Sequence, residues 1–255
     1  MYRASHLDGM ALVTGASTGI GKAVALELAR RGWRVALLAR RGDILAEVAR
    51  ERPDALYPYV CDVTDAPAVR ATIAKIMAGH GRVSLAFLNV GTYVPESAAG
   101  FDAASVMATF ATNIGGTMSV LEPLIAHMKS NGGQIAVNAS VAGYGGLPRA
   151  SAYGASKSAL INFCASQKFA LDPLNIRMQV VCPGFVRTPL TDKNTFPMPG
   201  LVEVEDAARR ICDGFERGGF EITFPRRLSW TLKALNMLPY SLYFPLVARL
   251  TGQES

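Results

Sequence analysis

The sequence predicts an α/β domain in which a doubly wound parallel sheet of seven strands carries helices on both faces. Short apolar runs alternate with longer stretches of helical periodicity along most of the chain, which is the order of strand–helix–strand units. The apolar runs are continuous and do not alternate with polar residues, as expected for strands that are covered on both faces. A chain of 255 residues, half of them hydrophobic and 18% charged, has the composition of one globular domain.

The expected strands are the apolar runs "MALVTG", "RVALLA", "ALYPYVC", "SLAFLN", "QIAVNA", "RMQVVC" and "EITF", at 10–15, 34–39, 55–61, 84–89, 134–139, 177–182 and 221–224. Amphipathic stretches between them predict helices near 20–31, 43–52, 65–79, 102–128, 151–171 and 203–217. No Ser- or Pro-rich linker interrupts the first 225 residues. Residues 1–225 are therefore expected to form a single catalytic domain, followed by an apolar extension at 226–255.

Composition argues against several classes of protein. The cysteines (Cys61, Cys164, Cys182 and Cys212) are widely spaced in apolar contexts, so we expect buried, reduced thiols and neither a metal site nor disulfides. The net charge is +6, but the positive residues are dispersed, which argues against nucleic-acid binding. The N-terminus has no apolar run of signal-peptide length, so we expect a cytoplasmic protein.

A glycine-rich turn follows the first expected strand and opens the first helix. The segment "VTGASTGIG" places Gly15, Gly19 and Gly21 where a tight turn lets the backbone approach a phosphate closely. The N-terminus of the next helix supplies N–H groups and partial positive charge. This strand–turn–helix context predicts a dinucleotide site, and the alternative is a helix-entry turn without a ligand.

The G-x-x-x-G-x-G spacing of this turn resembles that of the short-chain dehydrogenase/reductase family, and the resemblance continues in order over residues 8–225. The segments "CDVTD", "LNVG", "TNIGG", "NAS", "YGASK" and "PGFVRTP" are similar to successive motifs of that family. The family usually has a second asparagine where this chain has Leu88, and an alanine where it has Val90. The missing asparagine is tied mainly to strand packing in the family, so we expect little effect on the chemistry.

The resemblance implies a Rossmann-type domain that transfers a hydride between a nicotinamide cofactor and a carbonyl or secondary alcohol. By the same resemblance, Asp62 contacts the adenine, Asn113 orients a water that links Lys157 to solvent, and Thr188 lies near the nicotinamide amide. The expected catalytic residues are Asn113, Ser140, Tyr153 and Lys157. The expected cofactor-binding residues are Gly15, Ser17, Thr18, Gly19, Ile20, Gly21, Arg40, Arg41, Asp62, Val63, Asn89, Val90, Gly91, Tyr153, Lys157, Pro183, Gly184, Val186 and Thr188.

The end of the second expected strand indicates which nicotinamide cofactor is used. An acid there would accept from the ribose 2′-hydroxyl of NAD, but Ala39 stands at that place and two arginines follow. A guanidinium binds a 2′-phosphate through charge-assisted hydrogen bonds. We expect NADP(H), with Arg40 as the main ligand and Ser17 and Arg41 as helpers; solvated loop arginines are the alternative. Asp43 is expected to be the N-cap of the next helix.

Tyr153 and Lys157 are four residues apart and therefore share one face of a helix. A neighbouring ammonium favours the phenolate, so the sequence predicts that the pKa of Tyr153 lies below its ordinary value of about 10. Such a phenol would give a proton in reduction or take one in oxidation. Ser140 ends the fifth expected strand, where its hydroxyl can hold the substrate oxygen in line with Tyr153.

In the proline-rich loop at 188–201, Phe196, Met198 and Leu201 either line an apolar substrate pocket or anchor the loop. The extension at 226–252 is expected to form two short helices that are apolar on all sides, a pattern typical of burial in protein or lipid.

Pro239 separates the two helices of the extension, and Pro245 is expected to interrupt the second. The cations of the extension suit anionic headgroups. A lid over the substrate and a contact between subunits are favoured over a peripheral membrane contact through 226–252.

The sequence as a whole predicts an NADP(H)-dependent oxidoreductase for an apolar carbonyl or alcohol. One alternative is a lipid-type ketone reductase at the membrane surface. Another is a non-catalytic NADP(H)-binding regulator, which would not need Ser140, Tyr153 and Lys157 together. Because the family often assembles through its long helices, the resemblance also implies a homodimer or homotetramer, cytoplasmic or peripheral at a membrane.

Overall fold

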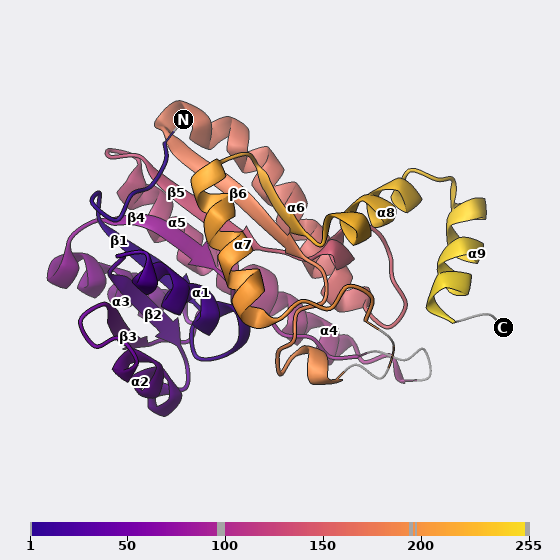
Figure 1. Ribbon diagram of the computed structural model, residues 1–255, viewed down its shortest axis with the longest axis horizontal. Coiled ribbons are helices and arrows are strands. Elements are labelled where there is room, and N and C mark those ends of the chain that lie inside the picture. Colours follow the sequence, from indigo (N-terminus) through magenta and orange to yellow (C-terminus); the bar gives the residue numbers. More distant parts are fainter. Residues whose placement is uncertain (1, 96–99, 194–195, 197, 253–255) are drawn as a thin grey trace.

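The computed structural model describes residues 2–95, 100–193, 196 and 198–252. Its centre is a seven-stranded parallel sheet in the order β3-β2-β1-β4-β5-β6-β7 (Figure 1). The strands are β1 (Met10–Thr14), β2 (Val35–Ala39), β3 (Leu56–Val60), β4 (Val83–Leu88), β5 (Gly133–Asn138), β6 (Ile176–Pro183) and β7 (Glu221–Phe224). The doubly wound α/β fold predicted from the sequence is thereby confirmed.

Helices cover both faces of the sheet, and α1 and α7 cross one face side by side (Figure 1). The longer helices are α1 (Gly19–Arg30), α2 (Gly42–Arg50), α3 (Ala66–His80), α4 (Ala103–Phe110), α5 (Gly116–Met128), α6 (Ser151–Leu171), α7 (Val204–Arg217), α8 (Arg226–Asn236) and α9 (Tyr240–Thr251). In β1, Ala11 and Val13 pack with α1, α2 and α7, whereas Met10 and Leu12 pack with α3, α5 and α6. Both faces of β1, β2, β4, β5 and β6 are buried, which explains their continuous apolar runs, whereas the edge strands β3 and β7 are partly exposed.

The sheet reverses its winding between β1 and β4, which are neighbours although two strands separate them in the chain. From β1 the chain runs outward through β2 to β3, and from β4 it runs the other way to β7. The loops at the carboxyl ends of β1 and β4 therefore diverge, and such a divergence is where open α/β sheets bind ligands.

Two boundaries differ from the sequence-based expectation. The helix expected at 102–128 contains a π-helical turn, Ala111–Gly115, between α4 and α5, and Asn113 lies in this turn. Asp43 was expected to be an N-cap, but α2 begins at Gly42 and its N-cap is Arg41. Asp43 therefore lies in the first turn, where its charge favours the helix dipole.

The C-terminal extension forms two helices that project from one end of the molecule (Figure 1). Pro245 lies inside α9 and does not interrupt it, contrary to the expectation. The expected burial of both helices is not met within the chain, because Ser229, Tyr243 and Val247 are the buried side chains that the structure describes there. All four cysteines are buried, as expected. Among the described residues, no helix combines the length and the apolarity that crossing a bilayer requires.

Candidate active site

The turn between β1 and α1 has the geometry of an anion site. Gly15 and Gly19 adopt left-handed backbone angles, with φ of 64° and 56°, which side chains other than hydrogen disfavour. A Cβ on Gly21 would lie 2.2 Å from the carbonyl oxygen of Gly15, so only glycine lets α1 start this close to the turn. The first turn of α1 carries no acid, and its N-cap, Thr18, makes no capping bond with its side chain. These N–H donors fit a dinucleotide phosphate.

The loop after β4 closes the other side of this turn. Thr14 Oγ1 accepts hydrogen bonds from the backbone N–H of Asn89, at 2.9 Å, and of Val90, at 3.3 Å. The side chain of Asn89 accepts from Asn138 Nδ2 at 2.8 Å. The carboxyl ends of β1, β4 and β5 are thus joined by hydrogen bonds around one crevice. Thr188 reaches the same place, since a Cβ on Gly19 would lie 3.3 Å from its methyl carbon.

The two arginines after β2 point in different directions. Arg41 Nη2 donates to Ser17 Oγ at 3.0 Å and to Thr18 Oγ1 at 3.1 Å, which places its guanidinium beside the glycine turn. Arg40 instead lies 3.7 Å from the carboxylate of Asp62 and is largely exposed. Arg41 is therefore nearer the turn than Arg40, which sequence reasoning had put first.

Asp62 is held at the carboxyl end of β3 by its own turn. Its Oδ1 accepts from the backbone N–H of Thr64 at 2.9 Å and from the Thr64 hydroxyl at 2.8 Å. The backbone bond contributes most to lowering the pKa of this carboxyl, and Arg40 adds to it. The other carboxylate oxygen faces Arg40.

The remaining expected cofactor residues also lie at carboxyl ends of strands. Val63 is buried against Gly116 of α5, and Pro183 ends β6. The backbone N–H of Gly184 donates to Phe224 of β7 at 2.7 Å, and Val186 forms a bridge with Val202. Their side chains and backbone thus shape the far wall of the crevice. Two further expected cofactor residues remain. Ile20 is half-buried in α1, and Gly91 is exposed in the loop after β4.

Tyr153, Ser140 and Lys157 meet at the carboxyl end of β5. The Ser140 hydroxyl lies close enough to the phenol of Tyr153 to lower its pKa. Lys157 Nζ lies 5.6 Å from the centroid of the Tyr153 ring and donates to the backbone carbonyl of Asn138 at 2.7 Å. The fourth expected catalytic residue, Asn113, is fully buried in the π-helical turn.

Asn113 ties three segments together. Its Oδ1 accepts from the backbone N–H of Thr92 at 2.7 Å, and its Nδ2 donates to Thr92 O and to Ser156 Oγ, at 3.1 and 2.9 Å. Ser156 in turn donates to the backbone carbonyl of Tyr153 at 2.7 Å. The π-helical turn, the loop after β4 and the first turn of α6 are therefore held in one arrangement by Asn113.

The pKa of Tyr153 moves opposite to the sequence-based expectation. Burial raises it to about 12, and the Ser140 hydroxyl offsets this only in part. Lys157 does not counter the shift, because its ammonium lies over the ring face and bonds to the Asn138 carbonyl. Burial also lowers the pKa of Lys157 to about 8, so this side chain is still largely charged at neutral pH.

Sequence reasoning missed two aromatic residues that follow β4 and β5, one of which, Tyr93, contacts the cluster. The ring of Tyr93 meets that of Tyr153 edge-on, with centroids 5.3 Å apart. Tyr144 donates to Glu221 at 2.8 Å and lies four residues after Ser140. Both follow strands at the carboxyl edge of the sheet, and that position was the available signal.

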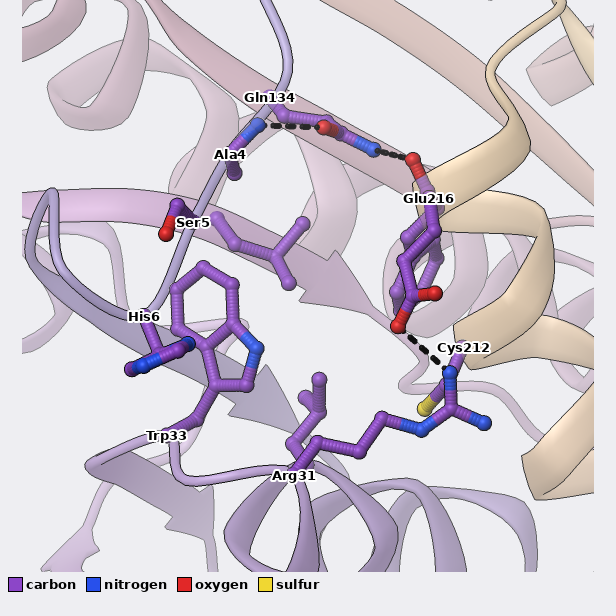
Figure 2. Close-up of a pocket in the computed structure, with 11 residues that line it drawn as sticks. Ala4, Ser5, His6, Arg31, Trp33, Gln134, Cys212 and Glu216 are labelled. Carbon is purple, nitrogen blue, oxygen red and sulfur yellow. Dashed lines mark hydrogen bonds and ion pairs between the residues drawn. The ribbon is translucent and has the colours of Figure 1, made fainter.

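A separate cavity of about 210 Å³ lies at the opposite edge of the sheet, where the strands begin (Figure 2). Arg31 spans its lower side and pairs with Glu216 at 2.7 Å, as Figure 2 shows. Gln134 accepts from the backbone N–H of Ala4 and donates to the carbonyl of Phe215, both at 3.0 Å. The polar side chains Arg31, Glu216 and Gln134 thus already have partners within the chain, and the cavity lies at the edge far from the glycine turn. The candidate active site is therefore the crevice at the carboxyl edge.

A model of the short chain dehydrogenase family matches residues 9–197. The chain belongs to this family. It is thus an oxidoreductase with the fold that binds a nicotinamide cofactor in short-chain dehydrogenases, as the resemblance in the sequence implied.

Other short-chain dehydrogenases resemble the chain over most of its length. An uncharacterized oxidoreductase of Myxococcus xanthus is 35% identical over 244 residues, which cover 94% of this chain and 96% of that protein. A 3-oxoacyl-acyl-carrier-protein reductase of Thermotoga maritima is 31% identical over 193 residues, which cover 74% and 78%. The crystal structure of a short-chain type dehydrogenase/reductase from Mycobacterium marinum matches with a TM-score of 0.77 at 28% identity, covering 86% of this chain and 97% of that one.

Proposed function

We propose that this short-chain dehydrogenase is an NADP(H)-dependent enzyme that interconverts an apolar ketone or aldehyde and its alcohol. The observation that carries the proposal is the cluster of Tyr153, Ser140 and Lys157 at the carboxyl end of β5, in the same crevice as the glycine turn. The 3-oxoacyl reductase named among the relatives supports a carbonyl group as the reacting centre.

The chain's own residues supply the proton and hold the substrate. The nicotinamide supplies the hydride in reduction and accepts it in oxidation. Tyr153 Oη gives the proton to the carbonyl oxygen in reduction and takes it back in oxidation. Ser140, which lies beside this phenol, donates to the same substrate oxygen. Lys157 holds its ammonium over the Tyr153 ring, and we assign it to binding the ribose of the nicotinamide.

The preference for NADP(H) is supported by the two guanidinium groups beside the crevice. Arg41 together with Ser17 and Thr18 offers donors at the glycine turn, and Arg40 adds a second positive charge nearby. A 2′-phosphate suits such a set, because charge-assisted bonds to guanidinium are strong and directional. We assign the main contact to Arg41 and a secondary one to Arg40.

Aromatic side chains around the crevice support an apolar substrate. Tyr93 is buried against the catalytic phenol, and Phe185 meets Phe196 with ring centroids 5.9 Å apart. Phe196 therefore contacts Phe185 in the loop after β6, and we assign it to the substrate side of the crevice. Of the loop expected to carry substrate contacts, residues 194, 195 and 197 lie outside the described part of the chain.

The test is a panel of ketones and alcohols assayed with NADPH, NADH and their oxidised forms. We expect turnover of apolar members with a preference for NADPH. Tyr153→Phe should lower kcat by about a hundredfold or more while NADPH binding, followed by fluorescence, stays within about twofold. Unchanged turnover by Tyr153→Phe would remove the proposed mechanism. Tight NADPH binding by a wild-type chain that turns over nothing would favour the non-catalytic regulator.

A further inference from the structure

We propose that α8 and α9 form a docking surface for a membrane that contains anionic lipid. The inference concerns a surface outside the crevice, and it does not depend on the proposed reaction.

The two helices and the turn between them expose large apolar side chains, whose contacts within the chain, such as the stacking of Tyr240 on Phe244, leave most of their surface open to solvent. Met237 is 86% exposed and Trp230 is 68% exposed. The exposed set, which we call the apolar tail surface, is Trp230, Met237, Tyr240, Leu242, Phe244, Leu246 and Leu250. Single exposed apolar residues are common, but a cluster of this kind on two consecutive helices marks an interaction site.

The apolar tail surface is presented by helices whose inner faces are held. Tyr243 Oη donates to the carbonyl of Gly146 at 2.8 Å, and Val247, one turn later, is also buried. In α8, Lys233 pairs with Glu221 of β7, and the hydroxyl of Ser229 bonds to Thr223. The exposed side chains are therefore those that point away from these anchors.

The positive charge of the extension indicates that the partner of the apolar tail surface is an anionic membrane. Residues 226–255 contain four cations, Arg226, Arg227, Lys233 and Arg249, and one acid, Glu254. Lys233 is paired with Glu221, whereas the three arginines are exposed and have no ion pair within the described residues. Cations beside an apolar surface are attracted to anionic headgroups.

The shape of the extension also suits a lipid surface. Trp230 and Tyr240 are the residue types that favour the boundary between headgroups and acyl chains. Helices of 11 and 12 residues are too short to cross a bilayer, so their apolar sides would enter only the outer part of one leaflet.

The test uses the full chain and vesicles of phosphatidylcholine, with or without phosphatidylglycerol, in a co-sedimentation assay. We expect binding to the mixed vesicles that weakens as salt is added. Leu242→Ser/Phe244→Ser should reduce the bound fraction about tenfold or more, because two exposed apolar side chains are lost. The matched control is Phe169→Ser, which changes a side chain 84% exposed on α6 and should leave binding unchanged.

A second variant keeps the test independent of the apolar substitutions. Arg226→Glu/Arg227→Glu should remove the preference for vesicles that contain phosphatidylglycerol. As a folding control, the melting curves of all variants should match that of the wild type, because the changed side chains are exposed. Three outcomes would overturn the inference: no binding to either vesicle, equal loss in the Phe169→Ser control, or a change of oligomeric state in the tail variants without lipid. The last outcome would identify a second copy of the chain as the occupant.

Discussion

At the scale of single residues, the phenol of Tyr153 has an environment that favours its protonated form. Its pKa is raised to about 12, and Ser140 and Lys157 both lie within reach of the same ring. A protonated phenol is the form that reduction consumes, and a phenolate is the form that oxidation requires. The chain's own residues therefore prepare Tyr153 to give a proton at neutral pH.

This environment predicts opposite pH profiles for the two directions. With saturating substrates, oxidation should speed up from about pH 7 to about pH 9, because the phenolate fraction rises with pH below the pKa. Reduction should change little between about pH 6 and pH 7.5, because the phenol is fully protonated there and Lys157, with a pKa of about 8, is mostly charged. Initial rates in both directions measure this, and an oxidation rate independent of pH would contradict it.

The different directions of Arg40 and Arg41 predict unequal effects of their removal. Arg41→Ala should raise the KM for NADPH about tenfold, since it removes a charge-assisted donor next to Ser17 and Thr18. Arg40→Ala is the matched comparison and should raise it less, because Arg40 faces Asp62. The KM for NADH should stay nearly constant in both variants. A larger increase in KM for Arg40→Ala would contradict this assignment and make Arg40 the main ligand of the 2′-phosphate, as the sequence predicts.

At the scale of elements, α1 and α7 are joined by an ion network centred on Glu27 and Arg31. Glu27 accepts from both Arg30 and Arg31 at 2.7 Å, and Arg31 also reaches Asp213 and Glu216 of α7. The bonds from Arg30, followed by those from Arg31, lower the pKa of Glu27 to about 2 although burial opposes this. The network thus fixes the helix that begins at the glycine turn.

The lowered pKa of Glu27 predicts acid sensitivity. The unfolded chain binds a proton at Glu27 below about pH 4.5, whereas the folded chain does so only near pH 2, so stability from this group is lost as the pH falls between these values. Glu27→Gln should lower the free energy of unfolding by about 1–3 kcal/mol at neutral pH. It should also flatten the fall in stability toward low pH, as measured by urea unfolding. An equally steep fall in the variant would contradict the assignment.

At the scale of the whole molecule, the C-terminal extension contacts the segment between Ser140 and Tyr153. Tyr243 donates to Gly146, and the ammonium of Lys233 lies 4.9 Å from the centroid of the Tyr144 ring. Removal of residues 240–255 should therefore raise the KM of the preferred ketone about three- to tenfold while leaving NADPH affinity nearly unchanged, and it should lower the melting temperature because the buried Tyr243 and Val247 are lost. Tyr243→Phe, which removes one hydroxyl, should show part of the effect. Loss of NADPH binding on truncation would contradict this division of roles.

Several predictions about the whole molecule remain predictions. The homodimer or homotetramer implied by the family resemblance, and the cytoplasmic location, follow from the sequence alone. The open choice between lid, subunit contact and membrane contact is narrowed by the exposed arginines and the apolar tail surface, which favour the membrane.

The sequence by itself determined the fold and the positions of the motifs. These features involve residues that are close together in the sequence, so the sequence alone reveals them. They are the continuous apolar runs, the glycines at 15, 19 and 21, and the Tyr153–Lys157 spacing. Tertiary structure alone decided the direction of the Tyr153 pKa shift, the approach of Arg41 to the glycine turn, and the exposure of α8 and α9. Solvation and charge contacts sum over residues far apart in the chain, so no local pattern contains them.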